Sequence, residues 1–110
     1  MTITWEDFEK VSLVTGTIIQ ADDFPEARIP AYKLLVDIGD GTLKKSSARI
    51  TDLYTKDELI GKQVVCVSNF PPKQIGSYIS EILVTGFYNE EGVVVLATPD
   101  KPIKNGAKLA

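Results

Sequence analysis

Apolar and polar residues alternate over several short stretches of the chain, which is the pattern of β-strands with one buried face. The pattern is clearest in residues 32–38, where every second residue is apolar: Tyr32, Leu34, Val36 and Ile38. A Gly-Asp-Gly turn at 39–41 predicts a hairpin into a strand at 43–50. Similar runs predict strands at 13–24, 63–70, 79–88 and 93–97. Gly16, inside the first of these, predicts a bulge or a bend.

Two short helices complete the pattern. Thr4 can cap a helix over residues 5–11, whose apolar side consists of Trp5, Phe8 and Val11. Residues 51–60 are predicted to form the second helix, which ends at Gly61. Three strands, a helix and two further strands are typical of a five-stranded Greek-key OB barrel. We therefore expect a mainly β protein with short helices at the N-terminus and between the third and fourth strands, plus a C-terminal extension. On periodicity alone, a small β-sandwich or an SH3-like barrel fits nearly as well.

The length of 110 residues predicts one domain, divided into an N-terminal helix in 1–12, a barrel in 13–88 and an extension in 89–110. Histidine is absent and Cys66 is the only cysteine. This composition excludes a Ser-His-Asp triad, a Cys-His dyad, a His-ligated metal and an intrachain disulfide. We expect Cys66 to be a buried, inert thiol. We also expect no catalytic site, no metal and no cofactor.

The N-terminal residues lack the basic and apolar regions of a signal peptide, and no apolar run is long enough to span a bilayer. We therefore expect a cytoplasmic protein without membrane insertion. The net charge is −3, but residues 28–73 hold eight bases and five acids, whereas residues 1–27 hold one base and six acids. The middle section indicates either a local site for a polyanion or a chance imbalance. A pI of about 4.9 is far from the basic character expected of a nucleic-acid binder.

Four stretches, in collinear order over nearly the whole chain, resemble a known family. They are VTGTIIQADDFPEARIPAYKLLVDIGD (14–40), KKSSARIT (44–51), LIGKQVVCVSNFPPKQIGSYISEILVTG (59–86) and PDKPIKNGAKL (99–109). These stretches resemble the free-standing tRNA-binding domain family, and specifically its CsaA-type secretion-chaperone branch. The resemblance implies an OB barrel that binds tRNA without base-specific readout. It also implies a homodimer and binding of unfolded or export-bound polypeptides.

A candidate RNA-binding face follows from the two-residue period of a strand. Lys45, Ser47 and Arg49 share one side of residues 43–50, while Ala48 and Ile50, in phase with Ser46, suit the core. With the resemblance, we expect five cations to contact phosphates: Arg28, Lys33, Lys45, Arg49 and Lys73. We expect three hydrogen-bonding neighbours: Ser47, Asn69 and Ser80. The alternative is an ordinary solvated strand face.

Three further side chains near this face carry their own expectations. Asn69 could instead hold its turn together, and Phe70 suits the core. Glu81 would repel phosphate, so we expect it to accept a hydrogen bond from Lys73 or Arg49 and orient that side chain.

Two apolar groups exceed what a lone barrel needs: Trp5 with Phe8, and the run 93–96, from which we single out Val94 and Leu96. They either cap the ends of the barrel or build the two-fold interface that the resemblance implies. Our sequence-based hypothesis is a non-catalytic, homodimeric tRNA-binding protein that acts as a protein-export chaperone. The alternatives are a polypeptide-binding chaperone and an assembly scaffold, each without a physiological nucleic-acid ligand.

Overall fold

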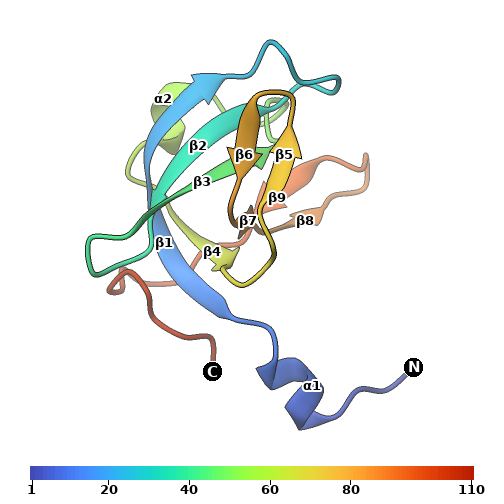
Figure 1. The fold of residues 1–110 in the computed structure, drawn as a ribbon, viewed down its shortest axis with the longest axis vertical. Coiled ribbons are helices and arrows are strands. Elements are labelled where there is room, and N and C mark those ends of the chain that lie inside the picture. Colours follow the sequence, from blue (N-terminus) through green and yellow to red (C-terminus); the bar gives the residue numbers. More distant parts are fainter.

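The backbone is built around one five-stranded antiparallel sheet with two hairpins beside it (Figure 1). The computed structural model describes residues 1–110. In the main sheet the strand order is β3-β2-β1-β4-β7, and the hairpins are β5–β6 and β8–β9. The elements are α1 (Trp5–Glu9), β1 (Leu13–Asp23), β2 (Tyr32–Asp37), β3 (Leu43–Ala48), α2 (Lys56–Leu59), β4 (Gln63–Val67), β5 (Lys73–Ile75), β6 (Tyr78–Ser80), β7 (Leu83–Val84), β8 (Gly86–Tyr88) and β9 (Val94–Leu96).

The sheet curls so that its two edge strands, β3 and β7, nearly meet. The segment between β6 and β7 joins them, because the amides of Glu81 and Ile82 both donate to the carbonyl oxygen of Lys45, at 2.7 and 3.3 Å. A curled sheet joined at its edges is a nearly closed barrel of five antiparallel strands. The predicted OB barrel is therefore confirmed, with its short helices at the N-terminus and between β3 and β4.

The core lies inside the barrel and contains the inward-facing residues of each strand. In β3 and the residue pair after it, Ser46, Ala48 and Ile50 are buried, as the two-residue period predicts. Cys66 is fully buried as well, and this burial raises the pKa of its thiol to about 12. Phe70 does not join this core. The prediction for Phe70 is wrong: the side chain is 55% exposed, because β4 ends at Val67 and no longer directs it inward.

Gly16 permits close packing rather than forming a bulge. A Cβ at this position would lie 2.6 Å from Val36 Cγ1 and 3.1 Å from the carbonyl oxygen of Asp37. The register of β1 against β2 shifts further along, between Ile18 and Gln20. A side chain at position 16 would therefore collide with the end of β2.

Two predicted elements differ from the observed ones. The second helix covers only Lys56–Leu59, because Thr55 and Glu58 form the capping box that starts it. The predicted strand at 79–88 is divided into β6, β7 and β8, and β5 was not predicted at all. The division occurs where the chain leaves the hairpin to close the barrel and then leaves the barrel to form the next hairpin.

The C-terminal residues cover the first part of β1. The amide of Thr15 donates to Ala107 at 3.0 Å, and the amides of Gly106 and Leu109 donate to Thr15 and Leu13 at 2.8 and 2.9 Å. These bonds cover the open edge of β1 with the tail, which forms one isolated bridge there, between Val14 and Lys108. None of the helices is long and apolar enough to cross a membrane.

Candidate functional site

Four residues on β2, on β3 and just beyond the end of β3 define an outward basic face: Lys33, Lys45, Ser47 and Arg49. Lys33 lies directly opposite Ser47 in the register of the two strands, and Lys45 lies opposite Leu35. Since directly paired residues point to the same side of a sheet, Lys33, Lys45 and Ser47 share one surface. None of the three ion pairs in the structure includes a cation of this face. Its positive charges are therefore available to an anion.

Two aromatic rings hold the lysines of this face. The Nζ atom of Lys45 lies 5.4 Å from the centre of the Tyr78 ring, and that of Lys33 lies 5.8 Å from the same ring. Lys33 is also 5.7 Å from the centre of the Phe24 ring, which meets Tyr78 edge to face at 5.3 Å. These are cation–π distances. Sequence reasoning missed both rings, because neither stands among basic residues in the sequence.

The Tyr78 hydroxyl is fixed on the barrel as a donor. It lies 3.3 Å from the carbonyl oxygen of Leu34 and 3.4 Å from that of Ser46. Burial, together with the nearby carboxylates of Glu81 and Asp22, raises the pKa of Tyr78 to about 12. The raised pKa keeps the phenol protonated into the alkaline range, so that its hydroxyl remains a hydrogen-bond donor to the barrel.

A groove of about 740 Å³ adjoins the basic face and brings four of the predicted site residues together: Ser47, Arg49, Lys73 and Ser80. Its lining residues come from the end of β3, the β5–β6 hairpin, β7 and the start of β8. Figure 1 shows how these elements are arranged. Much of its remaining lining is apolar and includes Ile50, Phe70, Ile75, Leu83, Val84 and Val94. The site thus has two parts, a cationic strand face and a mixed groove with an apolar wall.

Ser80 and Glu81 close the barrel with their side chains. Ser80 Oγ accepts a hydrogen bond from the Ser47 amide at 3.2 Å, and Glu81 Oε1 accepts one from the Lys45 amide at 3.0 Å. Glu81 forms no ion pair with Lys73 or Arg49, so the partner expected for it is wrong. Its carboxylate instead binds the Lys45 amide at the edge of β3.

Asn69 links β4 to the end of α1. Its Oδ1 atom accepts from the amide of Ser12 at 3.0 Å, and its Nδ2 atom donates to the carbonyl oxygen of Lys10 at 2.7 Å. Both ends of the amide are engaged within the chain, which favours the structural alternative for this residue. Arg28 is exposed in the loop between β1 and β2 and makes no hydrogen bond or ion pair with the other site residues.

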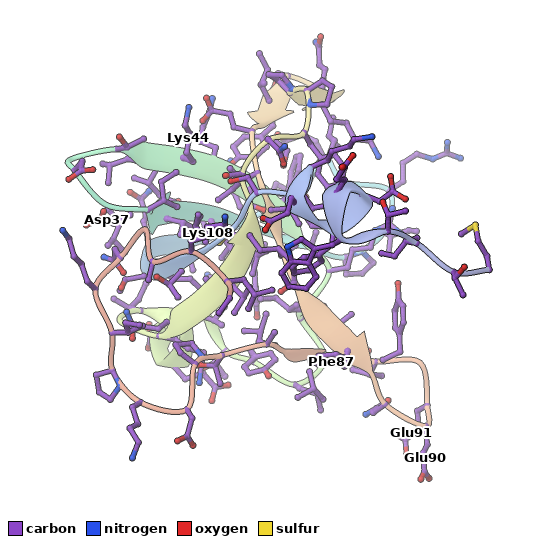
Figure 2. The ribbon with its side chains drawn as sticks, turned by 90° about the horizontal axis from the view of Figure 1, so that it is seen from below. Asp37, Lys44, Phe87, Glu90, Glu91 and Lys108 are labelled. Atoms are coloured by element: carbon purple, nitrogen blue, oxygen red, sulfur yellow. The ribbon has the colours of Figure 1, made fainter.

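The residues singled out for a two-fold interface lie in different environments. Leu96 is 7% exposed and belongs to the core, and Val94 is half-buried against it. The outward residues of the same hairpin are Phe87, Tyr88 and Val95, and Figure 2 shows Phe87 on β8 with Glu90 and Glu91 at the tip.

The N-terminal helix contributes apolar surface as well. Trp5 is 69% exposed, and its ring lies 5.4 Å from that of Phe8. Since α1 buries no residue, its aromatic pair does not cap the barrel.

The arrangement offers anion binding and apolar contact. No group of three or more His, Cys, Asp or Glu side chains is placed to hold a metal ion.

Comparison with known proteins places this site in context. Residues 13–108 match a family described as "Putative tRNA binding domain". The chaperone CsaA from Bacillus anthracis is 44% identical, with a TM-score of 0.94 over 100% of both chains. The CsaA chaperone from Picrophilus torridus is 49% identical, with a TM-score of 0.92 over 99% of this chain and 100% of that one.

A curated relative is much longer. A methionine–tRNA ligase from Methanocaldococcus jannaschii is 35% identical over 101 residues, which is 92% of this chain. The chain spans only 15% of the length of that ligase.

Proposed function

Since the chain belongs to the tRNA-binding domain family and matches CsaA chaperones over their full length, we propose that it binds tRNA without catalysis and acts as a chaperone in protein export. The observation that carries the tRNA proposal is the unpaired basic face in a chain whose net charge is −3. Cations left free of carboxylates on an acidic protein are placed for an external anion.

The proposed mechanism is contact with the sugar-phosphate backbone. Lys33 and Lys45 neutralise phosphates on the strand face, and Arg49 and Lys73 do so along the adjoining groove. The backbone of RNA presents the same charges whatever its sequence, so this binding depends on the shape of the RNA. Arg28 and the hydroxyl of Ser47 extend the contact at its edges, whereas Asn69 and Ser80 act by holding the surrounding backbone.

A homodimer forms part of the proposal. Phe87 and Tyr88 on β8, together with Trp5 on α1, expose large apolar surfaces. A second copy that covered them would bring two basic faces into one particle, which raises affinity for a large ligand through multivalency. We expect this dimer to work in the cytoplasm, where tRNA is found.

A second candidate ligand is an unfolded polypeptide bound in the groove. The apolar wall of the groove favours it, because an extended chain with large apolar side chains fills such a surface. Binding of this kind depends weakly on salt. A single groove could hold the polypeptide and, at its charged rim, an RNA phosphate.

The test is a titration of the protein with bulk tRNA at about 50 mM and about 200 mM salt. We expect affinity to fall steeply with salt, and we expect Arg49→Ala with Lys73→Ala to lower the salt slope by about two. Lys101→Ala, an exposed and unpaired cation in the C-terminal tail, is the matched control. An unfolded polypeptide added as competitor reports whether the groove is shared. A lack of tRNA binding at low salt would overturn the tRNA proposal and leave the polypeptide chaperone in its place.

A further inference from the structure

Both lysines of the basic face turn toward one tyrosine although carboxylates lie near them. Lys33 is paired directly with Asp22 across β1 and β2, yet it forms no ion pair with that carboxylate. The Asp22 carboxylate instead accepts from the side chain of Gln20 at 2.7 Å. The Glu81 carboxylate accepts from the backbone amide of Lys45 and leaves its ammonium group free.

The Tyr78 ring, which both ammonium groups approach, is rigidly mounted. Tyr78 starts β6, its hydroxyl lies at hydrogen-bond distance from two barrel carbonyls, and its edge contact with Phe24 fixes the plane of the ring. Phe24 is 4% exposed, so the platform is anchored in the protein interior. A lysine side chain normally loses much rotamer freedom when it binds a ligand.

We propose that Tyr78 is a positioning residue for RNA binding, which holds the ammonium groups of Lys33 and Lys45 in place for the phosphates of one strand before the RNA arrives. This inference rests on the proposed tRNA binding and adds a residue to it. Tyr78 acts through the lysines and does not itself contact the ligand. The ring therefore lowers the entropy lost when the two lysines are immobilised.

The first measurement uses the free wild-type protein. Protons that lie over the face of an aromatic ring resonate upfield in the NMR spectrum, so the terminal methylene signals of Lys33 and Lys45 should be shifted upfield relative to those of Lys101. Tyr78→Phe should keep these shifts, and Tyr78→Leu should abolish them. Unshifted lysine signals in the wild-type protein would overturn the proposal, even if Tyr78→Leu does not fold.

The second measurement is a set of double-mutant cycles on tRNA affinity at low salt. We expect Tyr78→Leu to weaken binding about three- to ten-fold, and Tyr78→Phe to remain within about two-fold of the wild type. In a Lys33→Ala, Lys45→Ala background, Tyr78→Leu should have no further effect. In a Lys73→Ala background its effect should persist in full.

The outcomes separate this inference from the proposed function. If the wild-type protein binds tRNA and Tyr78→Leu weakens binding equally in the Lys33→Ala, Lys45→Ala background, the ring contacts RNA directly and the positioning role is wrong. If the effects of Tyr78→Leu and Lys73→Ala fail to add, loss of the ring has displaced the whole β5–β6 hairpin, which also overturns it. If the wild-type protein binds no tRNA, the proposed function fails and the inference fails with it.

Discussion

Glu81 and Lys45 are joined by reciprocal hydrogen bonds, since the carboxylate of Glu81 accepts from the amide of Lys45 at 3.0 Å and the amide of Glu81 donates to the carbonyl oxygen of Lys45 at 2.7 Å. The two bonds join the ends of the curled sheet at the position where the basic face begins. One glutamate thus acts in closure of the barrel and in placement of Lys45.

Loss of this carboxylate should open the junction. We expect Glu81→Ala to lower the free energy of unfolding by about 1–3 kcal/mol, because it leaves the Lys45 amide without its acceptor. Glu81→Gln keeps an acceptor oxygen and should lose less than half as much. Urea unfolding measures both, and Glu90→Gln at the exposed tip of the β8–β9 hairpin is the control. If Glu81→Ala is as stable as the wild type, the backbone hydrogen bonds from Glu81 and Ile82 to Lys45 are sufficient to close the barrel.

Removal of the Asn69 side chain should release α1 from the barrel. Its amide binds Ser12 and Lys10, so Asn69→Ala leaves two backbone groups without their partner, and we expect a loss of about 1–2 kcal/mol. Hydrogen exchange should accelerate in residues 5–12 more than in the barrel strands. The tRNA affinity should change less than it does in Arg49→Ala. A large loss of affinity with unchanged exchange would instead make Asn69 a ligand contact.

The buried thiol gives a stability change at alkaline pH. The pKa of Cys66 is about 12 in the folded protein and 9.0 as its ordinary value, so the folded state keeps a proton that the unfolded state loses. Stability from this group is complete below pH 9 and is lost as the pH rises toward 12, by about 1.4 kcal/mol per pH unit. The pKa of Tyr78 is also raised to about 12, so the free energy of unfolding falls further above pH 10 as the unfolded state loses this proton.

Cys66→Ala removes the thiol and so isolates its contribution. Unfolding free energies measured from pH 8 to pH 11 should decline less steeply in the variant. Parallel curves would contradict the burial of the thiol, as would rapid labelling of Cys66 by a thiol reagent in the folded protein.

Substitutions on the two faces of the β8–β9 hairpin should have different effects, one on formation of the proposed dimer and the other on the free energy of unfolding. Phe87 is 71% exposed, so Phe87→Ser should convert the proposed dimer to monomer with little change in monomer stability. Leu96 is buried, so Leu96→Ala should lower stability by about 2–5 kcal/mol. Sedimentation over a range of concentrations measures the first effect, and urea unfolding measures the second. A monomeric wild-type protein would refute the proposed dimer.

Sequence periodicity predicts the strands well where one face is buried and the other is wet. In β3 the inward and outward residues alternate as predicted, because a shift by one residue would place Lys45 in the core. The same reasoning failed for Phe70 and for the strand at 79–88. Phe70 lies beyond the end of β4 at Val67. The division of 79–88 depends on where the β5–β6 hairpin meets β3, which is set by contacts between residues more than 30 positions apart. No local pattern in 79–88 records that junction.

Spacing along the strands also predicts only part of the candidate site. The cations of the basic face lie on regular strands, so their common side could be derived from spacing. Tyr78 belongs to a separate hairpin, and only the fold brings its ring against the ammonium groups of Lys33 and Lys45. The apolar run 93–96 left open whether Leu96 caps the barrel or belongs to an interface, and only the packing of β9 assigns it to the core.

The bonds between Thr15 and the C-terminal tail connect the first strand to residues 92 positions further along the chain. During synthesis, β1 is therefore made long before the segment that covers its edge. An uncovered strand edge pairs readily with a strand of another molecule. The edge of β1 is therefore covered only after residues 104–109 have been made, and a truncated chain that lacks them would keep this edge open permanently.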